Sequence, residues 1–337
     1  MEANLTMADD VVLVTGAGGF IGGHLVADLR KLGRRVRTVD IKPFDEWYQQ
    51  FRDVDNRRLD LRDRGACAEA ASGAREIYNL ACDMGGMGFI ETHKAECMLS
   101  VLINTHMLMA ARDAKCERYF YSSSACVYAA DKQTRPDVDP LRESDAYPAM
   151  PEDGYGWEKL FSERMCRHFR EDFGLQTRIA RYHNVYGPHG TYDGGREKAP
   201  AAICRKIIAA QLARASEIEV WGDGEQSRSF TYIDDCLWGT RAIMASDILD
   251  PINLGSDELV TINQLIDIVE QIAGATFKRR YNLGAPKGVR GRCSENTLIK
   301  DTLGWAPSIS LRDGMEKTYR WIHDEMVAPA ATRRVYA

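Results

Sequence analysis

Val11-Val-Leu-Val-Thr-Gly-Ala-Gly-Gly-Phe-Ile-Gly22 joins a short apolar run to a glycine-rich turn. The apolar run is typical of a buried parallel strand, and the pattern of residues 23–31 predicts a helix after the turn. Gly16, Gly19 and Gly22 have the GxxGxxG spacing of a dinucleotide-binding turn, where the backbone can approach a pyrophosphate closely and a helix N-terminus faces it. Glycine spacing alone is weak evidence, but strand, turn and helix follow here in the required order. The stretch therefore predicts a dinucleotide site.

A second strand is predicted at residues 35–40, and it ends in Asp40. An acid at this position accepts hydrogen bonds from both ribose hydroxyls of adenosine and repels a 2′-phosphate, so the sequence favours NAD over NADP. Basic residues on either side of Asp40 keep NADP as the alternative, and a solvated turn residue is the alternative without a cofactor. Asp60 and Leu61 follow a later turn and are predicted to meet the adenine.

Strand and helix patterns continue to alternate along the first half of the chain. Further strands are predicted at residues 76–81, in the segment that contains Ser124, and at residues 177–182, with a long helix at 94–115. Such alternation predicts an α/β fold with a Rossmann-like, doubly wound parallel sheet.

The alternation stops near residue 190. We therefore expect residues 1–190 to form the NAD-binding domain and residues 191–337 to form mainly a smaller C-terminal substrate-binding lobe, with chain crossovers between the two. Within that lobe, amphipathic helices are predicted at residues 261–274 and 311–327.

Tyr155 and Lys159 stand four residues apart at the start of a predicted helix, so their side chains share one face. A free tyrosine has a pKa of about 10, and a nearby ammonium, joined by an oxidised nicotinamide, favours the phenolate that a base needs. Ser124, at the end of the preceding strand, is placed to hold a substrate oxygen against the phenol. This trio suits removal of a proton from a sugar alcohol while hydride leaves the same carbon. An isolated YxxxK is more often a surface helix, but the upstream serine and the glycine-rich turn favour the catalytic interpretation.

Cys126 lies two residues after Ser124, and it faces the same side if the strand continues. A buried cysteine is usually an inert small hydrophobic residue. Beside the trio it is instead predicted to be a carbon base, because nearby positive charge lowers a thiol pKa from its usual value of about 8.5.

Four glycine-rich loops complete the predicted pocket. Residues 82–89 hold three glycines after a strand, where backbone can approach a ligand closely. Residues 194–198, 220–230 and 288–292 each combine glycine with basic side chains, and the first precedes a helix that begins near Ala199. One basic loop is more often a solvated surface, whereas three in one lobe predict a phosphate pocket.

The glycine-rich turn at 16–22, Ser124 with Tyr155 and Lys159, and the Trp-Gly-Asp-Gly of residues 221–224 resemble the extended short-chain dehydrogenase/reductase family that acts on nucleotide sugars. Residues 11 to the last helix take part in the resemblance. It implies a Rossmann-like enzyme that binds NAD.

A narrower resemblance is to the GDP-sugar epimerases of this family. It is carried by residues 83–88, 123–128, 183–187, 194–200, 228–230 and 289–292. It implies an isomerase that inverts C3 and C5 of a GDP-hexose through a transient 4-keto sugar, without net redox change. Homodimers are common in this family, so a homodimer is expected.

The resemblance also implies residue roles. Tyr155, Ser124 and Lys159 would run the oxidation at C4, while Cys126 would remove a carbon proton and Lys198 would return one. The implied cofactor contacts are Gly16, Gly19, Phe20, Ile21, Gly22, Asp40, Asp60, Leu61, Tyr155 and Lys159. The implied substrate contacts are Met84, Gly85, Gly86, Ser124, Ala125, Cys126, Asn184, Glu197, Lys198, Ala199, Lys206, Trp221, Gln226, Arg228 and Arg292.

Two other functions stay open. An epimerase-reductase of the GDP-fucose synthase type also pairs a cysteine with this trio, but it consumes NADPH, which Asp40 disfavours. A non-catalytic Rossmann protein that senses nicotinamide redox state would be expected to lose the Tyr155 and Lys159 pair, and both residues are present.

Composition excludes several classes. The 337 residues are 45% hydrophobic and 28% charged, as in a soluble globular protein, and the net charge of −5 argues against nucleic acid as a partner. Nine cysteines are scattered without a CxxC pair, so we expect reduced thiols, no metal site and a cytosolic protein. The polar first ten residues do not resemble a signal peptide, and no apolar run approaches the roughly 20 residues of a membrane helix.

Overall fold

The computed structural model describes residues 10–328. Its centre is a seven-stranded parallel sheet with the strand order β11-β6-β5-β4-β1-β2-β3. The strands are β1 (Val11–Thr15), β2 (Arg35–Asp40), β3 (Asp55–Arg58), β4 (Ala74–Asn79), β5 (Arg118–Ser124), β6 (Gln176–Tyr182) and β11 (Ile252–Leu254). This sheet confirms the predicted Rossmann-like fold class.

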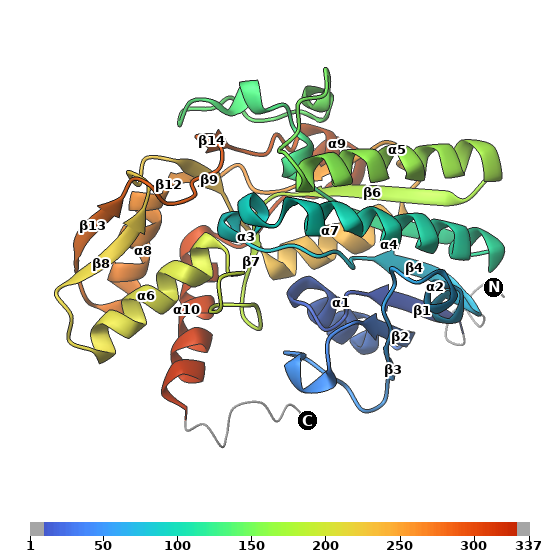
Figure 1. The fold of residues 1–337 in the computed structure, drawn as a ribbon, viewed down its shortest axis with the longest axis horizontal. Helices are drawn as coiled ribbons and strands as arrows, with labels where there is room; N and C mark the ends of the chain where they lie inside the picture. Colours follow the sequence, from blue (N-terminus) through green and yellow to red (C-terminus); the bar gives the residue numbers. More distant parts are fainter. Residues whose placement is uncertain (1–9, 329–337) are drawn as a thin grey trace.

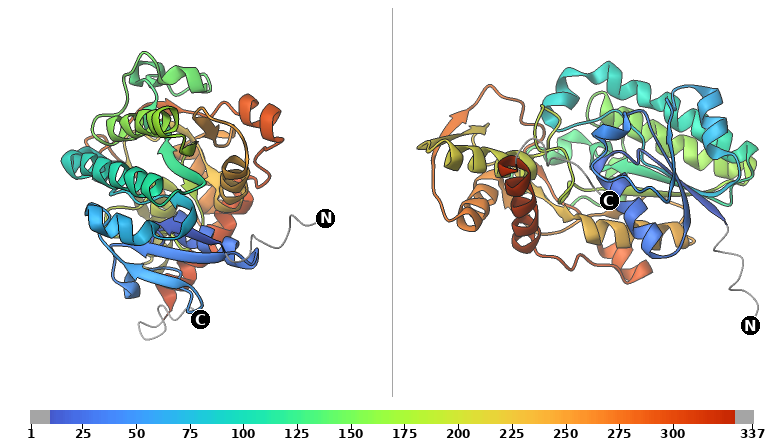
Figure 2. Two further views of the ribbon diagram at one scale, coloured as in Figure 1. Left: turned by 90° about the vertical axis from the view of Figure 1, so that its right-hand side faces the viewer. Right: turned by 90° about the horizontal axis from the view of Figure 1, so that it is seen from below.

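Two layers of helices cover the sheet (Figures 1 and 2). The helices are α1 (Phe20–Lys31) and α7 (Ile233–Ala245) on one face, and α2 (Arg64–Ala71), α4 (Lys94–Asp113) and α5 (Tyr155–Phe173) on the other. The central strand β1 shows why both layers form. Val12 and Val14 pack into the core on the α1 side, while Leu13, which points the opposite way, packs into the core with α2, α4 and α5. All three side chains are fully buried, as expected of a strand covered on both faces.

A second lobe lies at one end of the sheet, on the left in Figure 1. Its helices are α6 (Ala199–Leu212), α8 (Ile262–Ala273) and α10 (Leu311–Val327), which pack against one another. Its strands are β8 (Glu217–Trp221) paired with β13 (Lys278–Asn282), β7 (Val185–Tyr186) paired with β10 (Thr231–Tyr232), and β9 (Ser227–Ser229) between β12 (Leu259–Thr261) and β14 (Gly291–Arg292). The remaining helices are α3 (Met87–Thr92) and α9 (Thr297–Leu303), with short 3-10 turns η1 (Phe44–Glu46), η2 (Ala125–Val127), η3 (Ala130–Gln133) and η4 (Glu143–Ala146).

The chain returns to the central sheet after it has entered the second lobe. Both α7 and β11 follow residue 190, yet α7 packs on β6 and β11 pairs with β6. The division of the chain into residues 1–190 and 191–337 therefore describes the order of the sequence, and as a domain boundary it stays a prediction.

Most predicted elements are found within a few residues of their expected positions, and the helix predicted at 311–327 has those bounds. The expected strand through Cys126 is wrong. β5 ends at Ser124, because the Ser124 hydroxyl accepts a hydrogen bond from the backbone N–H of Cys126 at 3.2 Å and starts the turn η2. No helix among residues 10–328 has the length and apolar character needed to cross a membrane.

Candidate active site

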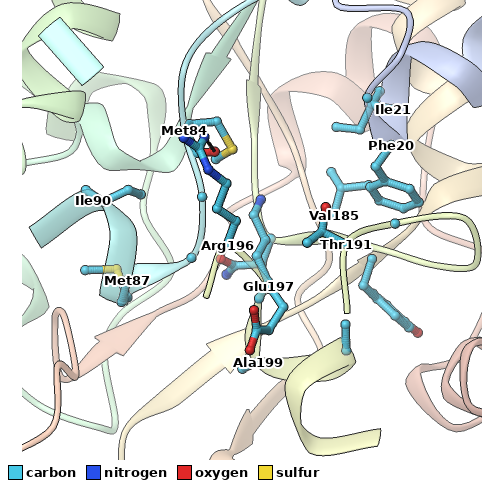
Figure 3. Close-up of a pocket in the computed structure, with 18 of the residues that line it drawn as sticks. Phe20, Ile21, Met84, Met87, Ile90, Val185, Thr191, Arg196, Glu197 and Ala199 are labelled. Atoms are coloured by element: carbon cyan, nitrogen blue, oxygen red, sulfur yellow. Dashed lines mark hydrogen bonds between the residues drawn. The ribbon is translucent and has the colours of Figure 1, made fainter. Parts of the chain in front are cut away.

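A cavity of about 1200 Å³ follows the carboxyl ends of β1, β4, β5 and β6 and continues between these strands and the second lobe. Ligands of open α/β sheets bind at this edge. Figure 3 shows Phe20 and Ile21 on one side of the pocket, Met84 and Met87 on another, and Glu197 between them. Every residue predicted to contact cofactor or substrate lines this cavity, with the single exception of Lys159.

Gly16 and Gly22 make the turn after β1 possible. Gly16 has a φ of +69°, and a Cβ there would lie 2.9 Å from the backbone nitrogen of Ala81. A Cβ on Gly22 would lie 2.2 Å from the carbonyl oxygen of Gly16, so any side chain would push α1 away from the turn. The backbone here forms a cradle of the kind that accepts a pyrophosphate at a helix N-terminus.

Asp40 is held rigidly at the rim of this cradle. One of its carboxylate oxygens accepts a hydrogen bond from the Gly18 N–H at 2.9 Å, and the other accepts one from the Lys42 N–H at 3.0 Å. The carboxylate lines the cavity, where it suits ribose hydroxyls and opposes a 2′-phosphate. The glycine turn and Asp40 together fit NAD.

Tyr155 begins α5 and is almost completely buried, with 4% of its surface exposed. Gly156 lets this end of the helix approach turn η2, because a Cβ there would lie 2.3 Å from the carbonyl oxygen of Cys126. This close contact places the tyrosine and the cysteine in one apolar cluster and at one cavity.

Lys159 lies beneath the site rather than in the cavity wall. Its ammonium is 5.4 Å from the centre of the Tyr155 ring, 4.8 Å from that of Tyr121, and 3.6 Å from the carboxylate of Glu158. Burial works to lower the pKa of Lys159, but the Cys82 thiol and Glu158 outweigh burial and raise it, so the lysine stays charged.

The expected lowering of the Tyr155 pKa is not seen. Burial raises this pKa well above its usual value, Cys82, Cys126 and Glu158 act in the same direction, and the Ser124 hydroxyl opposes them. The prediction included the charge of an oxidised nicotinamide beside that of the lysine, so for the chain without cofactor the loss of water around the phenol dominates. Ionisation of Tyr155 therefore needs additional positive charge, which an oxidised nicotinamide supplies when NAD is bound.

Cys126 lines the cavity, although it is only 7% exposed and belongs to the apolar cluster that also contains Tyr155. The guanidinium of Arg292 donates a hydrogen bond to the Cys126 sulfur at 3.4 Å, so the predicted positive neighbour is present. The predicted low pKa is nevertheless wrong. Burial and the negative charge of Glu152 outweigh Arg292 and raise the pKa of Cys126 to about 11.

Lys198 caps the N-terminus of α6 and lines the same cavity. Burial lowers its pKa, while the Cys126 and Cys82 thiols act to raise it. At a given pH a lysine with a lowered pKa has a larger neutral fraction than an exposed lysine, and a neutral amine can accept a proton.

The predicted nucleotide contacts lie in the part of the cavity formed by the second lobe. The Lys206 ammonium donates a hydrogen bond to the carbonyl oxygen of Glu219 at 3.0 Å and lies 5.3 Å from the centre of the Trp221 ring. Gln226 donates to the Trp221 carbonyl at 2.9 Å, and its own side-chain oxygen is buried without a partner among the described residues. This unpaired acceptor and the half-exposed Trp221 ring suit a nucleotide base.

The arginines of two of the predicted basic loops, Arg228 and Arg292, make different contacts. Arg228 is buried and donates to the carbonyl oxygens of Ser227 and Val289, and burial lowers its pKa to about 10. Arg292 lines the cavity, and its guanidinium donates hydrogen bonds to Cys126 and Glu152, while its predicted contact with the nucleotide stays a prediction. The structure therefore brings Arg228 and Arg292 to the cavity but gives Arg292 a place beside the thiol.

Several residues of the site were not predicted from sequence. Glu152 and Gln133 hold Arg292, Cys82 lines the cavity near Lys159, and Arg196 forms an ion pair with Asp83 at 2.6 Å that joins the loop before α3 to the segment before α6. Cys82, Asp83 and Arg196 belong to loops that the sequence did predict, whereas no motif surrounds Gln133 or Glu152, so only their contacts in space reveal those two residues.

Comparison with known proteins agrees with this geometry. The NAD dependent epimerase/dehydratase family matches residues 12–255. The chain is 44% identical over 320 residues to GDP-mannose 3,5-epimerase 1 of Oryza sativa subsp. japonica, and 43% identical over 320 residues to GDP-mannose 3,5-epimerase of Arabidopsis thaliana. Each alignment covers 94% of this chain and 82% of the relative.

Solved structures share the fold. UDP-glucose 4-epimerase from Thermotoga maritima, with UDP-glucose, has a TM-score of 0.84 at 23% identity and covers 94% of this chain and 99% of that chain. UDP-glucose 4-epimerase from Thermus thermophilus, in complex with NAD, has a TM-score of 0.80 at 21% identity and covers 92% of this chain and 98% of that chain. With the glycine turn, Asp40 and the Tyr155 site in one cavity, these findings confirm the predicted family and cofactor: the chain belongs to the NAD dependent epimerase/dehydratase family and is an isomerase that uses NAD.

Proposed function

We propose that the protein inverts C3 and C5 of GDP-mannose, giving GDP-L-galactose, with GDP-L-gulose as the product of inversion at C5 alone. The proposal is supported by the names of the similar plant enzymes and, above all, by one observation. Cys126 and Lys198, whose side chains can each accept or donate a proton, line the same cavity as Ser124 and Tyr155.

The first step is oxidation of the sugar at C4. NAD, when bound, supplies the chemistry of this step by accepting hydride from C4 and returning it at the end of the cycle. Tyr155 takes the proton of the C4 hydroxyl, and the Ser124 hydroxyl holds the same oxygen. The glycine turn and Asp40 would hold the cofactor. The Lys159 ammonium, 5.4 Å from the centre of the Tyr155 ring, favours the ionised phenol by its positive charge.

A ketone at C4 acidifies the hydrogens on C3 and C5. Cys126 removes one of these protons, and Lys198 gives a proton to the opposite face of the same carbon, which inverts it. The Ser124 and Tyr155 hydroxyls donate hydrogen bonds to the enolate oxygen at C4, where negative charge develops.

The resting ionisation of the two groups is the reverse of what these roles need, so a proton must first move from the thiol to the amine. The Cys126 thiol, with its pKa raised to about 11, is protonated near neutral pH, and Lys198 has a lowered pKa. Transfer of the thiol proton to the neutral Lys198 amine breaks S–H, forms N–H and yields thiolate and ammonium. Arg292, 3.4 Å from the sulfur, stabilises the thiolate.

The direct test is incubation of the enzyme with GDP-mannose in heavy water, followed by NMR. We expect deuterium at C3 and C5 of the recovered GDP-sugars, and new GDP-hexose signals, without added NADPH. Turnover that requires NADPH would instead support the epimerase-reductase. Absence of exchange with a panel of GDP-sugars would favour a protein that binds NAD without catalysis.

We also propose that the enzyme is a homodimer that pairs through α4 and α5. These helices pack side by side (Figure 1) and carry Met98 and Leu102, and Trp157 and Phe161, each pair one helical turn apart. The four side chains are between 38% and 50% exposed. An apolar patch on adjacent helices suits a second copy of the same surface, as in a two-fold dimer.

Met98→Glu combined with Phe161→Glu is expected to convert the dimer into a monomer, because two charges per chain would face apolar side chains of the partner. Light scattering after size-exclusion chromatography measures the mass. Leu212→Glu, an exposed leucine on α6, is the matched control and should leave the dimer intact. A monomeric wild-type protein at assay concentration would contradict the proposal.

The cytosol is the proposed site of action. All nine cysteines lie within the described residues and all are free thiols, as is usual in a reducing compartment.

A further inference from the structure

Arg292 joins three side chains that are far apart in the sequence. It lies at the end of β14 and is 4% exposed. Its guanidinium donates to the Glu152 carboxylate at 2.6 Å, to the Gln133 side-chain oxygen at 2.6 Å and to the Cys126 sulfur at 3.4 Å. Gln133 is itself fixed, because its amide group donates to the carbonyl oxygens of Tyr128 and Ala129. The direction of the guanidinium toward the sulfur is therefore set from two sides.

Glu152 is tied to Cys126 in a second way. Its backbone N–H donates to the Cys126 carbonyl oxygen at 3.0 Å. One carboxylate oxygen takes the Arg292 hydrogen bond, the other, Oε2, is buried, and the Cys126 thiol acts on the same carboxylate as a hydrogen-bond donor. A buried carboxylate is costly unless it is paired, and here its partners are the Arg292 guanidinium and the Cys126 thiol, so its charge acts directly on the reactive sulfur.

The charged groups that face Cys126 come from several elements. They are Lys198 immediately before α6, Arg228 of β9, Arg292 of β14 and Glu152 of the loop before α5, and the neutral phenol of Tyr155 on α5 lies beside them. Three of these are basic, and Glu152 provides the carboxylate. The ionisation of the thiol therefore depends on a balance in which Glu152 opposes the cations.

We propose that Glu152 is a positioning residue, which aims Arg292 at the Cys126 sulfur and keeps the thiol protonated between turnovers. The link to catalysis rests on the proposed function, in which Cys126 exchanges carbon protons. The negative charge of Glu152 disfavours a thiolate, while its hydrogen bond holds in place the cation that stabilises the thiolate once it forms. The resting thiol is thus shielded from ionisation, and its counter-ion is preorganised.

Glu152→Gln separates the two effects, because the amide oxygen can still accept from Arg292 but the charge is gone. The reactivity of Cys126 toward iodoacetamide is measured across pH in the resting enzyme, with the modified peptide quantified by mass spectrometry. We expect the midpoint of the alkylation–pH curve to move down by about one pH unit in Glu152→Gln. At a pH below the midpoints of both the variant and the wild type, Cys126 of the variant should therefore be alkylated about tenfold faster. Arg292→Gln should move the midpoint up.

Asp153→Asn is the matched control. Asp153 is the neighbouring carboxylate, but it is exposed and paired with Lys94 at 2.7 Å, so this variant should alkylate like the wild type. A folded Glu152→Gln variant whose Cys126 midpoint is unchanged, or moves up, would overturn the proposal.

The pH profile of deuterium exchange provides the second readout, and its acidic limb should move down in Glu152→Gln by the same amount. The alkylation experiment needs no sugar. Failure of the wild-type enzyme to exchange deuterium would refute the proposed function, whereas the shift in alkylation would still establish control of the thiol by Glu152.

Discussion

Cys126→Ala is expected to abolish deuterium exchange at C3 and C5 of GDP-mannose while oxidation at C4 survives. Cys126 lines the cavity and its sulfur has the Arg292 guanidinium at 3.4 Å, so the thiol is the group we expect to take a carbon proton and to be stabilised as a thiolate. Loss of a positioned general base reduces a rate by about 10²–10⁴-fold. NMR in heavy water measures the exchange, and the absorbance change of the nicotinamide on mixing with sugar measures the oxidation.

Cys97→Ala is the control for this variant. Cys97 is fully buried and belongs to the same apolar cluster as Cys126 and Tyr155, but it does not line the cavity. Its replacement should cost about 1 kcal/mol of folding free energy through lost packing and leave exchange unchanged. Epimerisation at the wild-type rate in Cys126→Ala would refute its assignment as the base.

Tyr155→Phe is expected to remove both the oxidation at C4 and the exchange at C3 and C5. The phenol is the group that takes the hydroxyl proton, and without a ketone at C4 the neighbouring hydrogens are not acidic. We expect kcat to fall by about 10²–10⁴-fold, with the nicotinamide absorbance change and deuterium incorporation lost together. This pattern differs from that of Cys126→Ala, in which only the exchange is lost.

Tyr121→Phe tests whether any buried hydroxyl near Lys159 has this effect. The Tyr121 ring is closer to the Lys159 ammonium than the Tyr155 ring is, but Tyr121 does not line the cavity. Its hydroxyl donates to Glu158 at 3.2 Å, so the variant should lose about 1 kcal/mol of stability and keep its activity. Exchange at the wild-type level in Tyr155→Phe, with oxidation intact, would show that another residue takes the C4 hydroxyl proton.

Local sequence patterns were enough to predict the cofactor turn and the Tyr155–Lys159 pair. The apolar run at 11–14, the glycines that follow it and Asp40 act through backbone geometry within one strand–turn–helix–strand unit, so their positions in space follow from their spacing. The same holds for Tyr155 and Lys159, which lie one helical turn apart. The pKa direction expected for Cys126 was wrong, because it depends on burial and on charges from other parts of the chain, and burial likewise raises the pKa of Tyr155 in the chain without cofactor.

The order of apolar, glycine and acidic residues thus determined the α/β sheet, the cofactor edge and the members of the predicted site, because strand burial, turn geometry and helical spacing are local properties. The tertiary structure decided what surrounds the Cys126 sulfur. Glu152, Gln133 and Arg292 meet there from three separate segments of the chain. The electrostatic potential at the sulfur depends on the distances to these groups in space, and the order of residues along the chain does not specify those distances.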